Sequence, residues 1–240
     1  MRYIAALLCL FLAGCQNSSA DGDLTRYANL GDGNTARLDM PEGPLQRVAV
    51  WFHGQNGDEN TRMNEDWLNT LRDHGWAVAA AEFHGSSWGN PESVTDTESL
   101  TAWIREQTGM APSLWIAGSM GAAVSLNALI NTDPDPACWY GAMPVVDLAT
   151  VSNVPAADEQ IAEAWNGNPQ NPDLSLLPNI RYRVLGSPDD DWVPANLNGE
   201  ALVNALRERG RDATYRAVSG EHGDASHFDA RDLQAFADTC

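Results

Sequence analysis

Leu114-Trp-Ile-Ala-Gly-Ser-Met-Gly121 is the stretch of sequence that decides the fold. The apolar residues of 113–117 predict a buried strand, and a helix is predicted directly after it, over 121–130. Ser119 therefore lies at a strand-to-helix turn, which strains its backbone and exposes its hydroxyl at the start of the helix. Ala117 and Gly121 are small enough to let the strand and the helix pass closely on either side of the serine. This pattern indicates a nucleophilic serine, and the simpler alternative is a serine that only caps the helix.

The rest of the chain alternates between strand-like and helix-like segments. Strands are predicted over 47–52, 76–81, 113–117, 139–146, 181–185 and 214–218, and helices over 64–74, 99–106, 121–130, 156–164, 197–209 and 229–238. Weaker extended segments around Tyr27 and over 36–40 suit antiparallel strands at one edge of the sheet. The alternation predicts the α/β class, with a mostly parallel central sheet of about eight strands and helices on both faces. Because the interval between residues 146 and 181 is short, we expect a minimal cap and an open site.

An acidic loop follows the strand predicted over 181–185. Its sequence, Ser187-Pro-Asp-Asp-Asp-Trp-Val-Pro194, carries the adjacent carboxylates of Asp189, Asp190 and Asp191. A carboxylate at the end of a strand is suited to orient a catalytic histidine. Three consecutive side chains diverge, so they make a poor calcium site. We expect the two carboxylates that do not bond to histidine to belong to a solvated turn.

Two histidines follow the last predicted strand. His222 lies in Gly220-Glu-His-Gly223, close to the end of that strand, and the neighbouring glycines would let its ring swing over the sheet. His227 lies at the entry to the last predicted helix, where a capping or packing role is the alternative to catalysis. His222 is therefore the favoured base.

The chain order Ser119, Asp190, His222, each after a predicted strand, resembles that of the α/β-hydrolase superfamily of esterases, lipases and prolyl-oligopeptidase-like peptidases. The resemblance extends over nearly all of the chain after its N-terminus. It implies the α/β-hydrolase fold and selects Asp190, which with Val193 and Pro194 forms the Asp-x-x-Val-Pro signature of the family's acid. One departure from the family pattern is Ala117, which stands where the first glycine of the serine motif is usual. A looser similarity to bacterial and phage α/β-hydrolases rests on the runs 84–91 and 220–224, and it implies the same triad.

The resemblance also assigns an oxyanion hole and a histidine that is not the base. Trp51-Phe-His-Gly-Gln-Asn-Gly57 ends an earlier strand, where the family places a His-Gly pair. By this resemblance the backbone N–H groups of Gln55 and Met120 would bind the oxyanion, while His53 would order the loop.

His84, Trp88 and Trp192 are predicted to bind substrate. All three lie in loops after the carboxyl ends of strands, the edge at which open α/β sheets bind ligands. An exposed tryptophan there would stack on a sugar or an aromatic acyl group. The alternative is that these side chains only pack in the core or the loops.

The amino-acid composition limits which partners and substrates the protein is expected to bind. The 240 residues carry a net charge of -19, and all 14 basic residues are arginine, because the sequence contains no lysine. Such a surface disfavours nucleic acid and favours neutral or cationic substrates. The lysine-free acidic composition fits either a protein that functions in high salt, where repulsion between its carboxylates is screened, or a GC-rich codon bias.

The N-terminus is typical of a secreted lipoprotein. Met1-Arg-Tyr3 is positive, residues 4–12 form a short apolar run, and Leu12-Ala-Gly-Cys15 resembles a bacterial lipobox. We expect residues 1–14 to be a signal peptide, Cys15 to carry lipid, and 15–25 to be a flexible tether before the α/β-hydrolase domain at 26–240. The protein would then be anchored to a membrane at the cell envelope or its extracellular face. A signal peptide cleaved elsewhere is the alternative.

Without the signal peptide and the cysteine expected to carry lipid, Cys138 and Cys240 remain as an even pair in an oxidising compartment. None of the four cysteines of the sequence has metal-ligand spacing. Cys138 precedes a strand, and Cys240 ends a helix that runs back to the same edge of the sheet. We therefore expect a disulfide bond between them, and neither a metal ion nor a cofactor.

These features predict hydrolysis of a carboxylic ester, small or polymeric, through an acyl-enzyme. Amide or peptide hydrolysis by the same triad is the nearest alternative. A non-catalytic surface lipoprotein that binds a glycan or a partner through Trp88 and Trp192 is the alternative from another class.

Overall fold

The computed structural model describes residues 24–133, 136–151 and 153–240. The predicted signal peptide, the predicted lipidation site at Cys15 and the predicted tether up to residue 23 lie outside the described residues. The first strand begins at Thr25, the last residue of the predicted tether.

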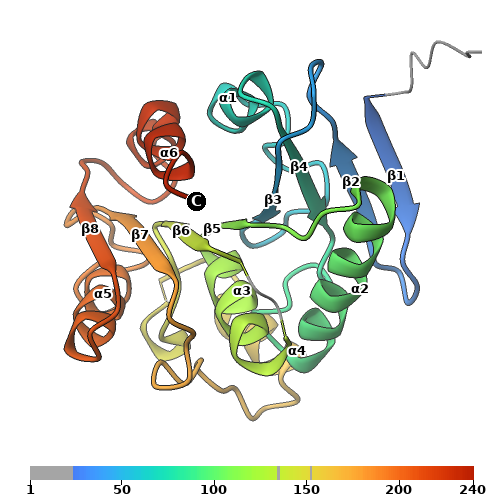
Figure 1. Ribbon diagram of the computed structural model, residues 1–240. Coiled ribbons are helices and arrows are strands. Elements are labelled where there is room, and N and C mark those ends of the chain that lie inside the picture. Colours follow the sequence, from blue (N-terminus) through green and yellow to red (C-terminus); the bar gives the residue numbers. More distant parts are fainter. Residues whose placement is uncertain (1–23, 134–135, 152) are drawn as a thin grey trace, which may run out of the picture.

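A single eight-stranded sheet runs through the molecule (Figure 1). Its strands are β1 (Thr25–Asn29), β2 (Thr35–Asp39), β3 (Arg47–Phe52), β4 (Trp76–Ala81), β5 (Leu114–Gly118), β6 (Cys138–Ala142), β7 (Arg181–Gly186) and β8 (Ala213–Ala217). They lie in the order β1-β2-β4-β3-β5-β6-β7-β8, and only the β1–β2 and β2–β4 pairs are antiparallel. The mostly parallel sheet, with its antiparallel strands at one edge, is confirmed.

Helices cover both faces of this sheet. They are α1 (Asp66–Asp73), α2 (Pro91–Thr108), α3 (Met120–Asn131), α4 (Ala157–Ala164), α5 (Gly199–Glu208) and α6 (Ala230–Ala237), with short 3-10 turns at Leu148–Thr150 and Ala225–His227. Figure 1 shows α1 and α6 on one face and the other helices on the opposite face. No helix of the described residues is both long and apolar enough to cross a membrane.

The two cores follow from the alternation of side chains along each strand. In β3, Val48, Val50 and Phe52 join the core with α2 and α3, whereas Ala49 and Trp51 join the core with α1 and α6. Because both faces of the central strands are buried, β4 and β5 are apolar at every position and β3 is apolar at every position after Arg47, as parallel strands usually are.

Two elements differ from their predicted bounds by more than two residues. The helix expected over 99–106 begins at Pro91, because the Asn90 side chain caps it by accepting a hydrogen bond from the Ser93 N–H at 3.0 Å. The strand expected over 139–146 ends at Ala142, since Met143 adopts a φ of 44° and leaves the extended conformation.

The C-terminal helix is fastened to the sheet at two places. Cys138 and Cys240 form the predicted disulfide bond, with Cα atoms 5.7 Å apart. Asp232 accepts hydrogen bonds from Arg183 Nε at 3.0 Å and Arg216 at 2.9 Å. Burial alone would raise the pKa of Asp232, but these guanidinium groups outweigh it and leave the pKa below its ordinary value. The helix therefore holds β6, β7 and β8 to one another behind the site described next.

Candidate active site

Ser119 lies at the turn between β5 and α3 with φ 52° and ψ -122°, a strained conformation for a residue that is not glycine. The close approach of neighbouring chains explains the small residues around it. A Cβ atom on Gly121 would lie 2.2 Å from the carbonyl oxygen of Phe52, so only glycine fits there. Ala117 is fully buried in β5. The turn thus presents the serine at the carboxyl end of the sheet.

Three side chains from separate loops meet at this turn. The imidazole of His222 lies between the two others, with Nε2 2.9 Å from Ser119 Oγ and Nδ1 2.7 Å from Asp190 Oδ2. A carboxylate only accepts, so Nδ1 donates to it and the neutral ring accepts the serine proton at Nε2. This arrangement is suited to draw a proton from the serine hydroxyl.

Asp190 is fixed by its own loop and is almost fully buried. Its Oδ1 accepts hydrogen bonds from the backbone N–H groups of Trp192 at 3.0 Å and Val193 at 2.8 Å, which leaves Oδ2 for histidine. Asp189 and Asp191 are exposed on either side. Of the three adjacent carboxylates, Asp190 is therefore buried, and Asp189 and Asp191 face solvent, as we expected of the two that do not bond to histidine.

The second histidine of this region, His227, makes no hydrogen bond to Ser119 among the described residues. His227 is completely buried, its Nδ1 lies 3.3 Å from the carbonyl oxygen of Asp224, and its Nε2 has no partner among the described residues. Burial lowers the pKa of His227 below its ordinary value. It is a packing residue, and His222 is the histidine that the fold brings to the serine.

The loop between β3 and α1 lies directly beside the serine. A Cβ atom on Gly54 would lie 3.5 Å from Ser119 Cβ, so the backbone of this loop contacts the turn. Met120 is the first residue of α3, and the N–H groups of a first helical turn have no partner within the helix. His53 is buried, and its ring nitrogens lie 2.8 Å from Gly54 O and 2.9 Å from Glu82 O. These contacts hold it away from the serine, in the loop-ordering position expected of it.

The three residues predicted to bind substrate have different environments. The Trp192 side chain is 43% exposed, and its ring centroid lies 5.7 Å from that of His222. The prediction for Trp88 is corrected, because its indole is fully buried in the core with α2 and α3 and offers no ring face to a ligand. His84 is part-exposed, with Nδ1 2.5 Å from Asp96 Oδ2 in α2. Burial raises the pKa of that carboxyl despite the histidine beside it.

Two residues near the site carried no signal in the sequence. Met143, with its φ of 44°, turns the chain after β6 so that its sulfur lies 3.2 Å from the Gly223 N–H, next to His222. Gln160 of α4 bonds to the side chain of Gln55 at 2.6 Å. Neither belongs to a motif, because a contact across 80 or 105 residues leaves no local pattern.

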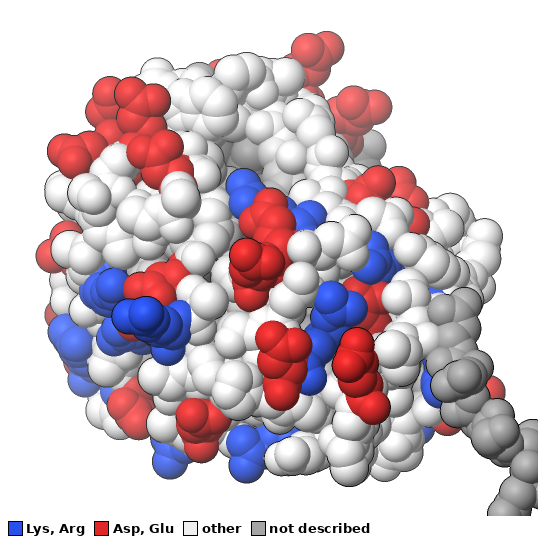
Figure 2. Space-filling model, turned by 90° about the horizontal axis from the view of Figure 1, so that it is seen from above, with Lys and Arg blue, Asp and Glu red and all other residues white. Residues whose placement is uncertain are grey.

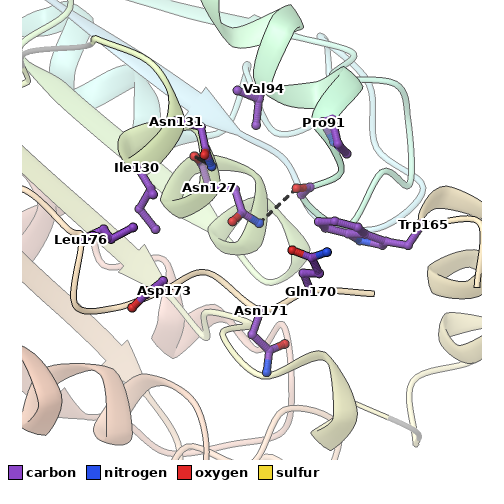
Figure 3. Close-up of a pocket in the computed structure, with 11 residues that line it drawn as sticks. Pro91, Val94, Asn127, Ile130, Asn131, Trp165, Gln170, Asn171, Asp173 and Leu176 are labelled. Atoms are coloured by element: carbon purple, nitrogen blue, oxygen red, sulfur yellow. Dashed lines mark hydrogen bonds between the residues drawn. The ribbon is translucent and has the colours of Figure 1, made fainter. Parts of the chain in front are cut away.

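The hollow in Figure 3 is a separate feature of about 380 Å³ between α2, α3 and the segment after α4. Asn127, which points into it, is eight residues after Ser119, roughly 12 Å along the helix axis. Its lining carries amides, apolar side chains and a single carboxylate, that of Asp173, without a serine or a histidine. The residues suited to acyl transfer therefore lie elsewhere, at the serine turn.

The surface charge is mixed where it is seen from above α1 and α6. Figure 2 shows the basic side chains of this face standing among carboxylates rather than forming a patch of one sign. Among the described residues, no three His, Cys, Asp or Glu side chains are grouped so that they would hold a metal ion.

Solved structures of hydrolases have a similar fold. The carboxylesterase Cest-2923 from Lactobacillus plantarum WCFS1 has a TM-score of 0.65 at 14% identity, over 90% of this chain and 94% of that chain. Thermogutta terrifontis esterase 2, phosphonylated by sarin, has a TM-score of 0.66 at 14% identity, over 91% of this chain and 94% of that chain. A puromycin-hydrolyzing peptidase of Mycobacterium tuberculosis has a TM-score of 0.69 at 18% identity, over 89% of this chain and 39% of that chain.

This chain thus matches nearly the full length of the two esterases but about two fifths of the peptidase. No protein-family model and no curated protein matches it. At these identities the similarity shows the α/β-hydrolase fold.

Proposed function

We propose that the chain is a serine hydrolase that cleaves a carboxylic ester, with Ser119 as nucleophile, His222 as base and Asp190 as the acid that orients it. The observation that carries the proposal is the hydrogen-bonded relay from Asp190 through His222 to Ser119, at 2.7 and 2.9 Å, on a strained strand-to-helix turn. Strain at such a turn persists only where the surroundings maintain it, and it is frequent at catalytic residues.

In the proposed mechanism, neutral His222 takes the proton of Ser119 Oγ at Nε2 as the oxygen attacks the ester carbonyl. The imidazolium is stabilised by Asp190, and it then gives the proton to the leaving alkoxide, which departs as the alcohol. Water attacks the acyl-serine with His222 again as base. The acid is released and the serine hydroxyl regains its proton.

The negative charge that develops on the carbonyl oxygen needs donors, and we assign the backbone N–H groups of Gln55 and Met120 to this role. The contact between Gly54 and the serine turn, and the position of Met120 at the start of α3, support the assignment. Loss of one such donor typically lowers kcat by about 10²–10³-fold.

Peptide or amide hydrolysis is the second candidate, because the solved structures with this fold include a peptidase as well as esterases. The same triad serves both reactions. The ester proposal is supported by the two esterases, because this chain matches 94% of the length of each. Paired ester and anilide substrates with the same acyl group would separate the two activities.

We also propose that Trp192 contacts the substrate. In addition, we propose that the protein is lipid-anchored at Cys15 on the outer side of a membrane. The lipobox-like Leu12-Ala-Gly-Cys15 supports the anchor, and the disulfide bond fits an oxidising compartment. Metabolic labelling with a fatty-acid analogue, compared between the wild type and Cys15→Ser, tests the anchor.

The decisive experiment is labelling of a soluble form, without the signal peptide and Cys15, by a fluorophosphonate probe at low and high salt. We expect Ser119→Ala and His222→Ala to abolish labelling and the hydrolysis of p-nitrophenyl esters. His74→Ala is the control, since His74 is exposed beyond the C-terminal end of α1 and its ring lies against the Thr70 carbonyl. A folded wild type that is not labelled at either salt would overturn the proposal and favour a non-catalytic binding protein.

A further inference from the structure

Gln160 of α4 reaches across to the loop beside Ser119 and uses both ends of its amide there. Its Oε1 accepts a hydrogen bond from Gln55 Nε2 at 2.6 Å, and its Nε2 donates to Asn56 Oδ1 at 3.0 Å. Trp88 Nε1 donates to the same Oε1 at the longer distance of 3.4 Å. One side chain thus joins two consecutive loop residues to a helix that is about a hundred residues away in sequence.

The loop needs such support, because Asn56 has a φ of 58°. The left-handed conformation is unfavourable for a residue with a side chain, although asparagine tolerates it better than most. The Asn56 N–H donates to Ser86 Oγ at 3.0 Å, and the Ser86 hydroxyl in turn donates to Asn56 Oδ1 at 3.2 Å. The conformation is therefore maintained by side chains of α4 and of the loop after β4.

We infer that Gln160 is a positioning residue for the reaction, which holds the Gln55 N–H where the oxyanion forms. The inference rests on the proposed function. Gln160 bonds to the side chains of Gln55 and Asn56, so it fixes the two residues that directly follow Gly54, and the peptide unit between Gly54 and Gln55 carries the Gln55 N–H. Preorganised donors stabilise a transition state only if they are in place before the reaction, and a misplacement of about 1 Å costs roughly 10²-fold.

The effect should differ from that of losing the triad. His222 and Asp190 make none of these hydrogen bonds, so the proton transfer and its pH dependence are left unchanged. The oxyanion contact is stronger in the transition state than with bound ester, so kcat should fall while KM stays nearly constant. A purely structural role would instead reduce the thermal stability or the fraction of competent sites.

The experiment compares Gln160→Met, Gln160→Ala and Gln160→Glu with the wild type. Gln160→Met keeps most of the side-chain volume without the hydrogen bonds, and Gln160→Glu keeps the acceptor for Gln55 but loses the donor to Asn56. Glu159→Ala is the matched control, an exposed residue on the same helix. Competent sites are titrated with the fluorophosphonate, and kcat and KM for a p-nitrophenyl ester are measured per titrated site across pH.

For Gln160→Met and Gln160→Ala we expect kcat per titrated site to fall about 10- to 100-fold, with KM within about twofold and an unchanged pH profile. The kcat per titrated site of Gln160→Glu should lie between that of these two variants and that of the wild type. The inference is overturned if Gln160→Met matches Glu159→Ala in kcat per site, or if only KM changes. A wild type that does not react with the probe overturns the proposed function instead, so the two failures are distinct.

Discussion

The indole ring of Trp192 lies against the imidazole ring of His222, with ring centroids 5.7 Å apart and ring planes tilted by 32°. The backbone N–H of the same tryptophan donates to Asp190 Oδ1 at 3.0 Å. Trp192 therefore contacts His222 through its ring and Asp190 through its backbone N–H.

Trp192→Ala should lower kcat/KM for p-nitrophenyl esters by about 3- to 10-fold, since an aromatic contact of this kind contributes about 0.5–1.5 kcal/mol. Trp192→Phe should retain most of the activity, and both variants keep the backbone N–H that holds Asp190. Leu197→Ala, another exposed apolar side chain of the same loop region, is the control. Wild-type activity in Trp192→Ala would show that the ring plays no part in the reaction.

Asp190→Asn should lower kcat by roughly 10³–10⁴-fold, because an amide no longer fixes the histidine tautomer that accepts the serine proton. Asp189→Asn and Asp191→Asn remove the same charge from exposed neighbours and should stay within about twofold of the wild type. Steady-state kinetics of the three variants test this. Equal losses in all three would mean that the loop acts through its net charge rather than through one carboxylate.

Much of this architecture is readable from the sequence because the signals are local. Buried parallel strands are nearly continuous apolar runs, so β3, β4 and β5 stand out within one residue of their true bounds. The same holds for the serine turn, since Gly121 is required by contact with the Phe52 carbonyl at the end of β3.

What the sequence did not predict depends on contacts between distant segments. Trp88 lies in a loop after a strand, just as Trp192 does, yet one ring is buried and the other is 43% exposed. Burial of that kind is decided by what packs over the loop. The role of Gln160 likewise arises only when α4 folds back onto the loop at 54–57.

Removal of the disulfide bond should destabilise the fold without removing the site. Cys138→Ala with Cys240→Ser should lower the free energy of unfolding by about 2–5 kcal/mol, because the bond closes a loop across a sequence separation of 102. Urea unfolding measures this, and ester hydrolysis at 25 °C should remain, since α6 keeps its hydrogen bonds to Arg183 and Arg216. A stability equal to that of the wild type would mean that these hydrogen bonds alone hold the helix.

His227 should make the protein sensitive to acid. Burial lowers the pKa of His227 below its ordinary value of 6.5, so the unfolded chain takes up this proton at a higher pH than the folded chain does. The stability that depends on neutral His227 is therefore complete above that value and is lost as the pH falls below it. His227→Gln removes this titration and leaves every other histidine in place, so the difference between the two proteins isolates the buried ring. We expect the free energy of unfolding of the wild type to fall more steeply than that of His227→Gln between about pH 8 and pH 5.5, measured by urea unfolding. Parallel slopes would show that His227 has the same pKa in the folded and the unfolded chain, and loss of fluorophosphonate labelling in a folded His227→Gln would contradict the assignment of the base to His222.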